Sequence, residues 1–256
     1  MDGVLWSDET PIGDLEKIFK QIQLFQLRYG FATNNSTKAP TDYKNKLNRF
    51  LVPAEETQII TSGTAIVNLL KEKHPQGGPV YILGEEGLRK SLQNAGFYHR
   101  KDNVLAVVGG LDRKVTYEKL KQATLLLQSN VDFFFTNIDP AFPTPQGKIP
   151  GAGSLLRSLE AGSKKKAILA GKPLPMMFEY LMKDLSAQPE NTLVIGDRME
   201  TDILGGLNAH CLTALVLTGI SKKADLHHYS YQPHMVFDDL STLVDQLSSQ
   251  NWEISR

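Results

Sequence analysis

Short runs of hydrophobic residues alternate with amphipathic stretches along most of the 256 residues of the chain. The apolar runs have the length of buried strands, and the stretches between them repeat hydrophobic residues at helical spacing. The predicted strands are Tyr29–Thr33, Val80–Leu83, Val104–Val108, Val131–Thr136, Thr192–Ile195 and Ala214–Leu217. The predicted helices are Leu15–Leu27, Thr64–Lys73, Thr116–Ser129, Pro175–Leu185 and Met199–Ala209. This alternation predicts an α/β fold built on a largely parallel sheet.

Two turn-rich segments interrupt the alternation. One is Lys73–Pro79, and the other is Pro140–Gly153, which contains four prolines and three glycines. Exposed segments of this kind tolerate the insertion of one domain into another. The sequence therefore predicts a core formed by residues 1–65 and 167–256, with residues 66–166 inserted as a second domain.

Composition narrows the class of protein. The chain has 28 basic and 28 acidic side chains, and this zero net charge argues against a nucleic-acid-binding protein. Its single cysteine, Cys211, excludes an intrachain disulfide and a cysteine-rich metal site, and its apolar surroundings predict a buried core thiol. No apolar run reaches the roughly 18 residues of a membrane helix, and the N-terminus lacks a signal-peptide pattern. We therefore expect a cytoplasmic protein that binds neither membranes nor nucleic acids.

The most informative motif follows the predicted strand Thr192–Ile195. The strand ends in Gly196-Asp197, and a second aspartate, Asp202, comes five residues later. Two carboxylates held close together at a strand end repel each other and need a cation between them. Hard oxygen ligands with room for water favour Mg²⁺ over zinc. The alternative is that Asp202 caps a helix.

Two further loops have the chemistry of phosphate binding. Hydroxyls, amides and backbone N–H groups in Thr33-Asn34-Asn35-Ser36-Thr37 can cradle a phosphate, although Ser36 or Thr37 could equally cap a helix. Lys172 lies between Gly171 and Pro173, on a non-helical backbone from which its ammonium can point at an anion. A loop lysine can also be merely solvated. Near the N-terminus, Asp2-Gly3 is by itself a common turn dipeptide.

Taken together, these motifs resemble the signature of the haloacid dehalogenase (HAD) phosphatases. The most similar subgroup includes the 4-nitrophenyl phosphatases, pyridoxal phosphate phosphatase, phosphoglycolate phosphatase and bacterial nucleotide phosphatases. Thr33–Thr37 resembles the second motif of the subgroup, Gly171–Pro173 the third and Gly196–Asp202 the fourth, while Val107–Asp112 and Thr136–Asp139 resemble parts of its large cap. The resemblance implies a doubly wound, Rossmann-like parallel-sheet core with an inserted α/β cap domain.

The resemblance also implies roles for individual residues. Asp2 and Lys172 would be catalytic, Asp2 as general acid and base and Lys172 by neutralising the phosphoryl oxygens. The implied phosphate ligands are Thr33, Asn34, Asn35 and Lys172, and the implied Mg²⁺ ligands are Asp197, the Asp2 carbonyl and Asp202, the last partly through water. In the cap loop Asn137–Gln146, Asp139 and Phe142 would lie over the leaving group, although Phe142 could instead pack locally.

The first motif of the family, Asp-x-Asp-Gly-Val, matches this chain only from its second aspartate onward. Because Asp2 occupies that second position, the nucleophilic aspartate is expected one position before Met1, at the end of an apolar strand. An intact site would hydrolyse a small phosphorylated metabolite through an aspartyl-phosphate. The alternative is a non-catalytic protein that kept the phosphate and metal sites. Relatives in the subgroup often dimerise through the cap, so a homodimer is also compatible with the resemblance.

Overall fold

The computed structural model describes residues 1–144 and 146–249, so Pro145 of the predicted cap loop and residues 250–256 of the predicted core lie outside the description. The chain divides into two compact units. The first unit contains residues 1–32, 43–59 and 172–256, and the second contains residues 33–42 and 60–171. Both turn-rich segments lie inside the second unit. The domain bounds predicted from the sequence stay a prediction.

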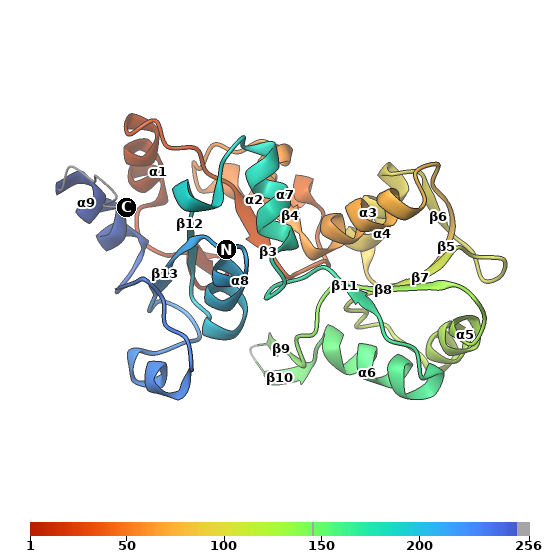
Figure 1. Cartoon of the computed structure of the whole chain (residues 1–256). Coiled ribbons are helices and arrows are strands. Elements are labelled where there is room, and N and C mark those ends of the chain that lie inside the picture. The colour runs from red at the N-terminus through yellow and green to blue at the C-terminus, as the bar shows by residue number, and fades with distance from the viewer. Residues whose placement is uncertain (145, 250–256) are drawn as a thin grey trace. The chain divides into compact units, whose positions relative to one another are not determined.

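The second unit is an α/β layer structure. Its five-stranded sheet is parallel throughout and has the order β11 (Ile168–Leu169), β8 (Asp132–Phe135), β7 (Ala106–Gly109), β5 (Gly78–Leu83) and β6 (Phe97–His99). Figure 1 shows helices on both faces of this sheet, with α3 (Ser62–Lys73) and α4 (Glu86–Asn94) on one side and α5 (Tyr117–Leu127) and α6 (Ala152–Ser163) on the other. The mixed α/β class with a parallel sheet that the sequence predicted is confirmed.

Alternation along the strands explains why this sheet is covered on both faces. Phe133 and Phe135 of β8 pack in one cluster with Leu156 of α6, whereas Phe134, which lies between them, points to the opposite face because successive strand residues alternate. All three phenylalanines are fully buried. A hairpin of β9 (Ala141–Thr144) and β10 (Gly147–Pro150) precedes α6.

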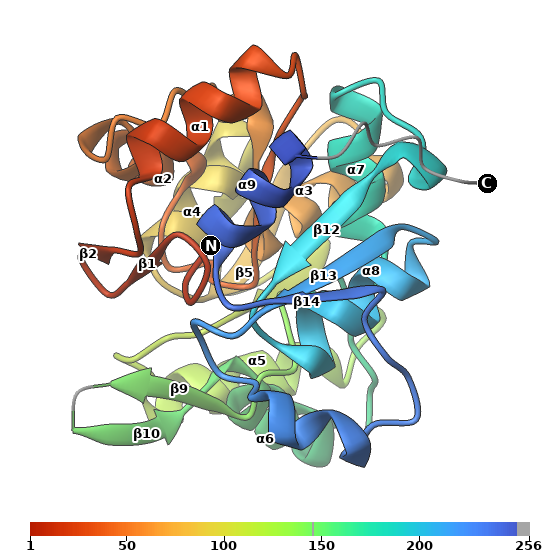
Figure 2. The same ribbon diagram turned by 90° about the vertical axis from the view of Figure 1, so that its left-hand side faces the viewer.

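The strands of the first unit form separate ladders. Parallel strands β12 (Leu193–Gly196), β13 (Leu212–Val216) and β14 (Met235–Phe237) make one sheet, and Figure 2 shows them side by side. Strand β3 (Phe31–Thr33) pairs with β4 (Ile59–Thr61), at the border with the second unit. A short hairpin joins β1 (Trp6–Ser7) to β2 (Thr10–Pro11). In the described residues no ladder connects these three groups.

Helices of the first unit pack on both faces of the β12–β14 sheet. One cluster joins Ala214 and Val216 to α1 (Leu15–Leu24), α2 (Pro40–Arg49) and α9 (Leu240–Ser249), and Figure 2 shows α9 beside α1. Another cluster joins Val194 and Cys211 to α7 (Met176–Asp184). Cys211 is therefore a buried core thiol, as predicted. Within the described chain, no helix has both the length and the apolar character needed to cross a membrane.

The predicted helix Met199–Ala209 begins in a different way from the other helices. Residues Met199–Ile203 form one turn of π-helix, and the α-helix α8 follows only at Leu204–Asn208. The wider turn places Asp202 in the first turn after β12, where its N–H donates to the carbonyl of Arg198. Single π-helical turns of this kind are frequent at functional sites.

Candidate active site

Asp197 and Asp202 lie in one buried polar cluster of the first unit. Asp197 directly follows β12, and Asp202 belongs to the π-helical turn; the two residues are 7% and 8% exposed. The backbone N–H of Ile220 donates to Asp197 Oδ2 at 2.9 Å. The Asp202 carboxylate accepts from Lys172 Nζ at 2.5 Å, and Asp202 therefore does not act as a helix cap.

Lys172 contributes the positive charge of this cluster. It is 6% exposed, and its ammonium donates to the carbonyl of Ala32 at 3.4 Å as well as to Asp202. The interpretation of Lys172 as a solvated loop lysine is therefore wrong. Because Ala32 belongs to β3, the lysine connects the end of that strand to the turn that follows β12.

The two carboxyl groups have opposite pKa shifts. Burial and then the negative charge of Asp202 raise the pKa of Asp197. Burial acting alone would also raise the pKa of Asp202, but Lys172 and the Met1 ammonium outweigh it and lower that pKa. A buried pair of carboxylates in which one is neutralised by a lysine leaves Asp197 as the group that gains most from an added cation.

Three glycines hold the main chain close to these carboxylates. A Cβ atom added at Gly3 would lie 2.4 Å from Asp197 Oδ2, and one added at Gly219 would lie 2.0 Å from the same atom. At Gly196 it would lie 2.1 Å from Cβ of Asp202. Gly3 also has φ = +75°, a conformation that glycine adopts without strain. The Asp2-Gly3 turn expected from the sequence is thus also what brings the N-terminal loop against Asp197.

Asp2 lies on that N-terminal loop and is exposed. Its carboxylate Oδ1 accepts from Trp6 Nε1 at 2.9 Å. The amino group of Met1 is buried in the same cluster; burial and the charge of Lys172 lower its pKa, while Asp2, Asp202 and Asp197 act in the opposite direction. The structure therefore brings Asp2, Lys172, Asp197 and Asp202 together in the first unit.

Three hydrogen bonds of the loop Thr33–Thr37 are formed within the loop itself. Thr33 Oγ1, in a residue that is 5% exposed, accepts from the N–H of Asn35 at 3.2 Å. Asn35 Oδ1 accepts from the N–H of Thr37 at 3.0 Å and from its hydroxyl at 2.7 Å. The next helix, α2, begins only at Pro40, so neither Ser36 nor Thr37 caps a helix. The loop is a compact polar turn.

Asn34 is held by three side chains of the second unit. Its carbonyl accepts from Ser62 Oγ at 2.5 Å and from Asn137 Nδ2 at 2.8 Å. Its own amide donates to Asp139 Oδ2 at 3.1 Å, so two residues predicted for the site, Asn34 and Asp139, are in direct contact. Thr33, Asn34, Asn35 and Asp139 all belong to the second unit, whereas Asp2, Lys172, Asp197 and Asp202 belong to the first.

Phe142, the remaining predicted site residue, lies in β9 of the hairpin. Its half-buried ring packs against the core cluster of the second unit, and the Arg113 guanidinium carbon lies 5.9 Å from the ring centroid. Arg113 is in turn bound by Glu85 through two bonds of 2.7 Å. The local packing that the sequence left open for Phe142 is present. Contact with a substrate stays a prediction.

Several residues of the cluster were missed from the sequence. Trp6 binds Asp2, Thr218 Oγ1 donates to the Gly3 carbonyl at 2.5 Å, and the buried Ser221 hydroxyl accepts from the N–H of Met199 at 3.0 Å. Thr218 and Ser221 follow the predicted strand Ala214–Leu217. The rule that loops after parallel strands meet at one edge could have selected those two residues.

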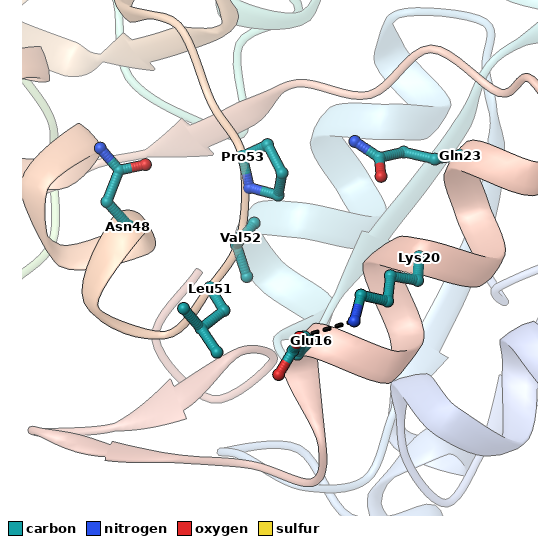
Figure 3. A pocket seen from close by; sticks show the side chains of 7 residues that line it. All are labelled: Glu16, Lys20, Gln23, Asn48, Leu51, Val52 and Pro53. Carbon is teal, nitrogen blue, oxygen red and sulfur yellow. Dashed lines mark hydrogen bonds and ion pairs between the residues drawn. The ribbon is translucent and has the colours of Figure 1, made fainter.

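A cavity of about 410 Å³ lies elsewhere in the first unit, between α1 and the end of α2. Figure 3 shows that its lining combines the Glu16–Lys20 ion pair with uncharged residues, namely Gln23, Asn48, Leu51, Val52 and Pro53. None of the predicted site residues lines it. Within the described chain, no three His, Cys, Asp or Glu side chains form a ready-made metal cluster, so a metal at Asp197 would also need main-chain or water oxygens.

Comparisons with known proteins find similar sequences and structures along most of the chain. Residues 1–98 match the sequence model of the family described as haloacid dehalogenase-like hydrolase, and residues 169–243 match the HAD-hydrolase-like model. The chain is 32% identical over 244 residues to 5'-nucleotidase YutF of Bacillus subtilis, covering 95% of each chain.

Solved structures are similar along most of the chain. A 4-nitrophenylphosphatase from Thermotoga maritima matches with a TM-score of 0.90 and 30% identity, over 96% of this chain and 94% of that one. A glycerol phosphate phosphatase from Mycobacterium tuberculosis, solved in complex with magnesium, matches with a TM-score of 0.85 and 27% identity, over 95% of this chain and 74% of that one.

Proposed function

This chain belongs to the haloacid dehalogenase-like hydrolases and is a phosphatase of that family, and we propose that it hydrolyses small-molecule phosphate monoesters with Mg²⁺ through an aspartyl-phosphate intermediate. The observation that carries the proposal is the buried ion pair of Lys172 with Asp202 beside Asp197. A buried lysine next to two carboxylates is costly for folding alone, but it matches a phosphoryl group and its counter-ion.

The donors of the cluster fit Mg²⁺. Asp197 and Asp202 offer hard carboxylate oxygens, and glycines pack the N-terminal loop against Asp197, so the Asp2 carbonyl is a third candidate ligand. Burial and the charge of Asp202 raise the pKa of Asp197. A cation bound at Asp197 would relieve its repulsion from Asp202. When bound, Mg²⁺ supplies positive charge that neutralises phosphoryl oxygens. The relative from Mycobacterium tuberculosis, crystallised with magnesium, supports this choice.

The proposed nucleophile is an aspartate one position before Met1, as the register of the Asp-x-Asp motif requires. One observation supports it. The main-chain nitrogen of Met1, to which a preceding residue would be joined, is buried among Lys172, Asp202 and Asp197.

The proposed reaction has two displacements. In the first, the nucleophilic carboxylate attacks phosphorus, the bond to the ester oxygen breaks, and Asp2 gives its proton to that oxygen. In the second, Asp2 takes a proton from water as the water oxygen attacks phosphorus, which releases phosphate and restores the carboxylate. Lys172 holds a phosphoryl oxygen through both steps.

The second unit would supply phosphate ligands and substrate selection. Thr33, Asn34 and Asn35 would bind phosphoryl oxygens, and Asp139 and Phe142 would lie over the leaving group. The substrate would be a small phosphorylated metabolite, because the relatives named above act on nucleotides, nitrophenyl phosphate or glycerol phosphate. We further propose that the protein is cytoplasmic and binds neither nucleic acids nor membranes. A homodimer is compatible with this function.

The test is phosphate release from 4-nitrophenyl phosphate, a nucleoside monophosphate and glycerol phosphate, with Mg²⁺ and with EDTA. The natural protein with its upstream aspartate should hydrolyse phosphate esters with Mg²⁺ but not with EDTA. Asp→Asn at the upstream position should abolish this hydrolysis. In H₂¹⁸O, a single turnover should place one ¹⁸O in the released phosphate and none in the nucleophilic carboxylate, because the water oxygen attacks phosphorus. Label in the carboxylate after a single turnover would mean that water attacks the acyl carbon. Mg²⁺-dependent turnover by residues 1–256 alone would contradict the assigned nucleophile.

A further inference from the structure

The side chain of Trp6 binds the exposed carboxylate of Asp2. Its indole is fully buried, with 0% exposure, and Nε1 donates to Asp2 Oδ1 at 2.9 Å. A buried indole N–H needs a hydrogen-bond partner, and here the partner is a carboxylate on the proposed reaction path. The sequence offers no motif for this contact beyond the spacing of four residues.

Main-chain bonds close the same short loop. The N–H of Gly3 donates to the carbonyl of Trp6 at 2.9 Å, and the N–H of Leu5 donates to the carbonyl of Met1 at 2.9 Å. Asp2 and Trp6 also form an isolated β-bridge. Main-chain contacts of the loop therefore fix the backbone of Asp2, and the Trp6 indole fixes its side chain. A short side chain held at both ends has little rotamer freedom left.

Behind the indole lies a buried lysine that the proposed reaction does not use. Lys46 of α2 is 6% exposed, and its ammonium lies 4.4 Å from the centroid of the Trp6 ring. The ammonium also donates to the Asp8 carbonyl and, at 3.3 Å, to the Glu9 carboxylate, at the tip of the β1–β2 hairpin. These bonds keep the cation over the ring.

The contacts of Lys46, Trp6 and Asp2 distinguish the two oxygens of the Asp2 carboxyl group. An indole N–H donates and cannot accept, and the carbonyl oxygen of a carboxylic acid accepts better than its hydroxyl oxygen, so the bond to Oδ1 favours a proton on Oδ2 of Asp2. A cation over the ring face is attracted by the ring electrons, and polarisation along a chain of contacts strengthens the donor at its end. Lys46, Trp6 and Asp2 therefore present one defined oxygen for proton transfer.

We propose that Trp6, supported by Lys46, is a positioning residue that orients the general acid Asp2 so that Oδ2 faces the leaving oxygen. The proposal rests on the proposed function of Asp2. It predicts a loss that depends on the leaving group, because a poor alkoxide leaving group needs the proton and a good nitrophenolate leaving group hardly does.

The decisive experiment removes one N–H and leaves the ring in place. In a Trp252→Phe background, Trp6 is the only tryptophan of the chain, and growth of a tryptophan auxotroph on benzothienylalanine replaces its N–H by sulfur. In the natural protein, kcat for glycerol phosphate should fall by about 10- to 100-fold, within the usual contribution of a general acid, with KM unchanged. The kcat for 4-nitrophenyl phosphate should fall by less than about threefold.

Phe50→Leu is the matched control, since the Phe50 ring packs against Trp6 with 5.9 Å between the ring centroids. Any change in this variant should be equal for the two esters. Lys46→Met should produce a smaller loss than the sulfur isostere, again greater for glycerol phosphate. Equal losses for both esters with the isostere would overturn the positioning role.

A measurement without turnover separates this proposal from the proposed function. The ultraviolet resonance Raman band that reports hydrogen bonding at the indole nitrogen should shift toward the unbonded position in Asp2→Ala, in the same Trp252→Phe background. An unchanged band would overturn the Trp6–Asp2 contact, whatever the activity. A shifted band in a protein that hydrolyses neither ester would instead overturn the proposed function, and the positioning role of Trp6 with it.

Discussion

Replacing Lys172 by methionine should destabilise the protein strongly at neutral pH. Lys172 and Asp202 are 6% and 8% exposed and 2.5 Å apart, so the substitution keeps the side-chain volume but leaves Asp202 charged, buried and beside Asp197. Removing one partner of a buried ion pair costs about 3–5 kcal/mol, because the remaining charge is uncompensated. A typical domain has about 5–15 kcal/mol of stability, so the variant should be only marginally folded at 25 °C.

The effect should depend on pH in a defined direction. In the parent, Lys172 helps to lower the pKa of Asp202 against the opposing effect of burial. The Asp202 carboxylate therefore stabilises the fold at pH values above its unfolded pKa. This contribution is lost as the pH falls through the pKa of Asp202 in the folded protein. Without Lys172, burial and Asp197 raise the pKa of Asp202, and protonation removes the buried charge. The destabilisation by Lys172→Met should therefore shrink as pH falls from 7 toward about 5.

The assay is urea unfolding followed by circular dichroism in EDTA at both pH values. Lys183→Met, at an exposed position of α7, is the matched control and should change stability by less than about 0.5 kcal/mol. The double variant Lys172→Met, Asp202→Asn should recover much of the loss, because neither charge remains. A loss below about 1 kcal/mol for Lys172→Met at pH 7, or a loss that grows as pH falls, would refute the reasoning.

Three further predictions concern single side chains. Asp197→Asn should weaken Mg²⁺ binding by more than about tenfold without unfolding the protein, and equal affinity in calorimetric titration would remove Asp197 from the site. Phe142→Ala should change relative rates across a panel of phosphate monoesters; an unchanged profile would mean that the ring only packs on Arg113. Burial raises the pKa of the Cys211 thiol to about 11, so at pH 8 iodoacetamide should label it only after unfolding in urea, whereas fast labelling of the native protein would contradict its burial.

The secondary structure could be predicted well wherever hydrophobic residues are periodic. All six predicted strands and the predicted helices exist, because apolar runs between polar turns have few other ways to be buried. Helices α2, α4, α6 and α9 were not among the predicted helices. The sequences of α2 and α4 are dominated by polar residues, and these two helices bury only narrow stripes. The π-helical turn at Met199–Ile203 was missed as well, because periodicity cannot distinguish a single wider turn from an α-helix.

Part of the charged cluster could be foreseen because Asp197 follows β12 and Lys172 follows β11, and ligands bind where parallel strands end. The two strands belong to different sheets, so this rule selects the residues but does not predict their contact. Contacts between side chains that do not lie at strand ends could not be predicted from the sequence. Lys46 is one of three lysines or arginines in α2, and its sequence neighbours give no sign that it is the one that stacks on Trp6.

The contact between Asn34 and Asp139 was likewise not predicted from the sequence. The sequence assigned one to the phosphate and the other to the leaving group, on separate grounds, yet the amide of Asn34 donates to the carboxylate of Asp139. Asn137 binds the Asn34 carbonyl and also accepts from the N–H of Asp139, at 3.1 Å. The loop Thr33–Thr37 and the segment after β8 are therefore one hydrogen-bonded structure, in which a change at Asp139 should also displace Asn34. Selection of the leaving group and binding of the phosphate would then be coupled through these three residues, within the second unit itself.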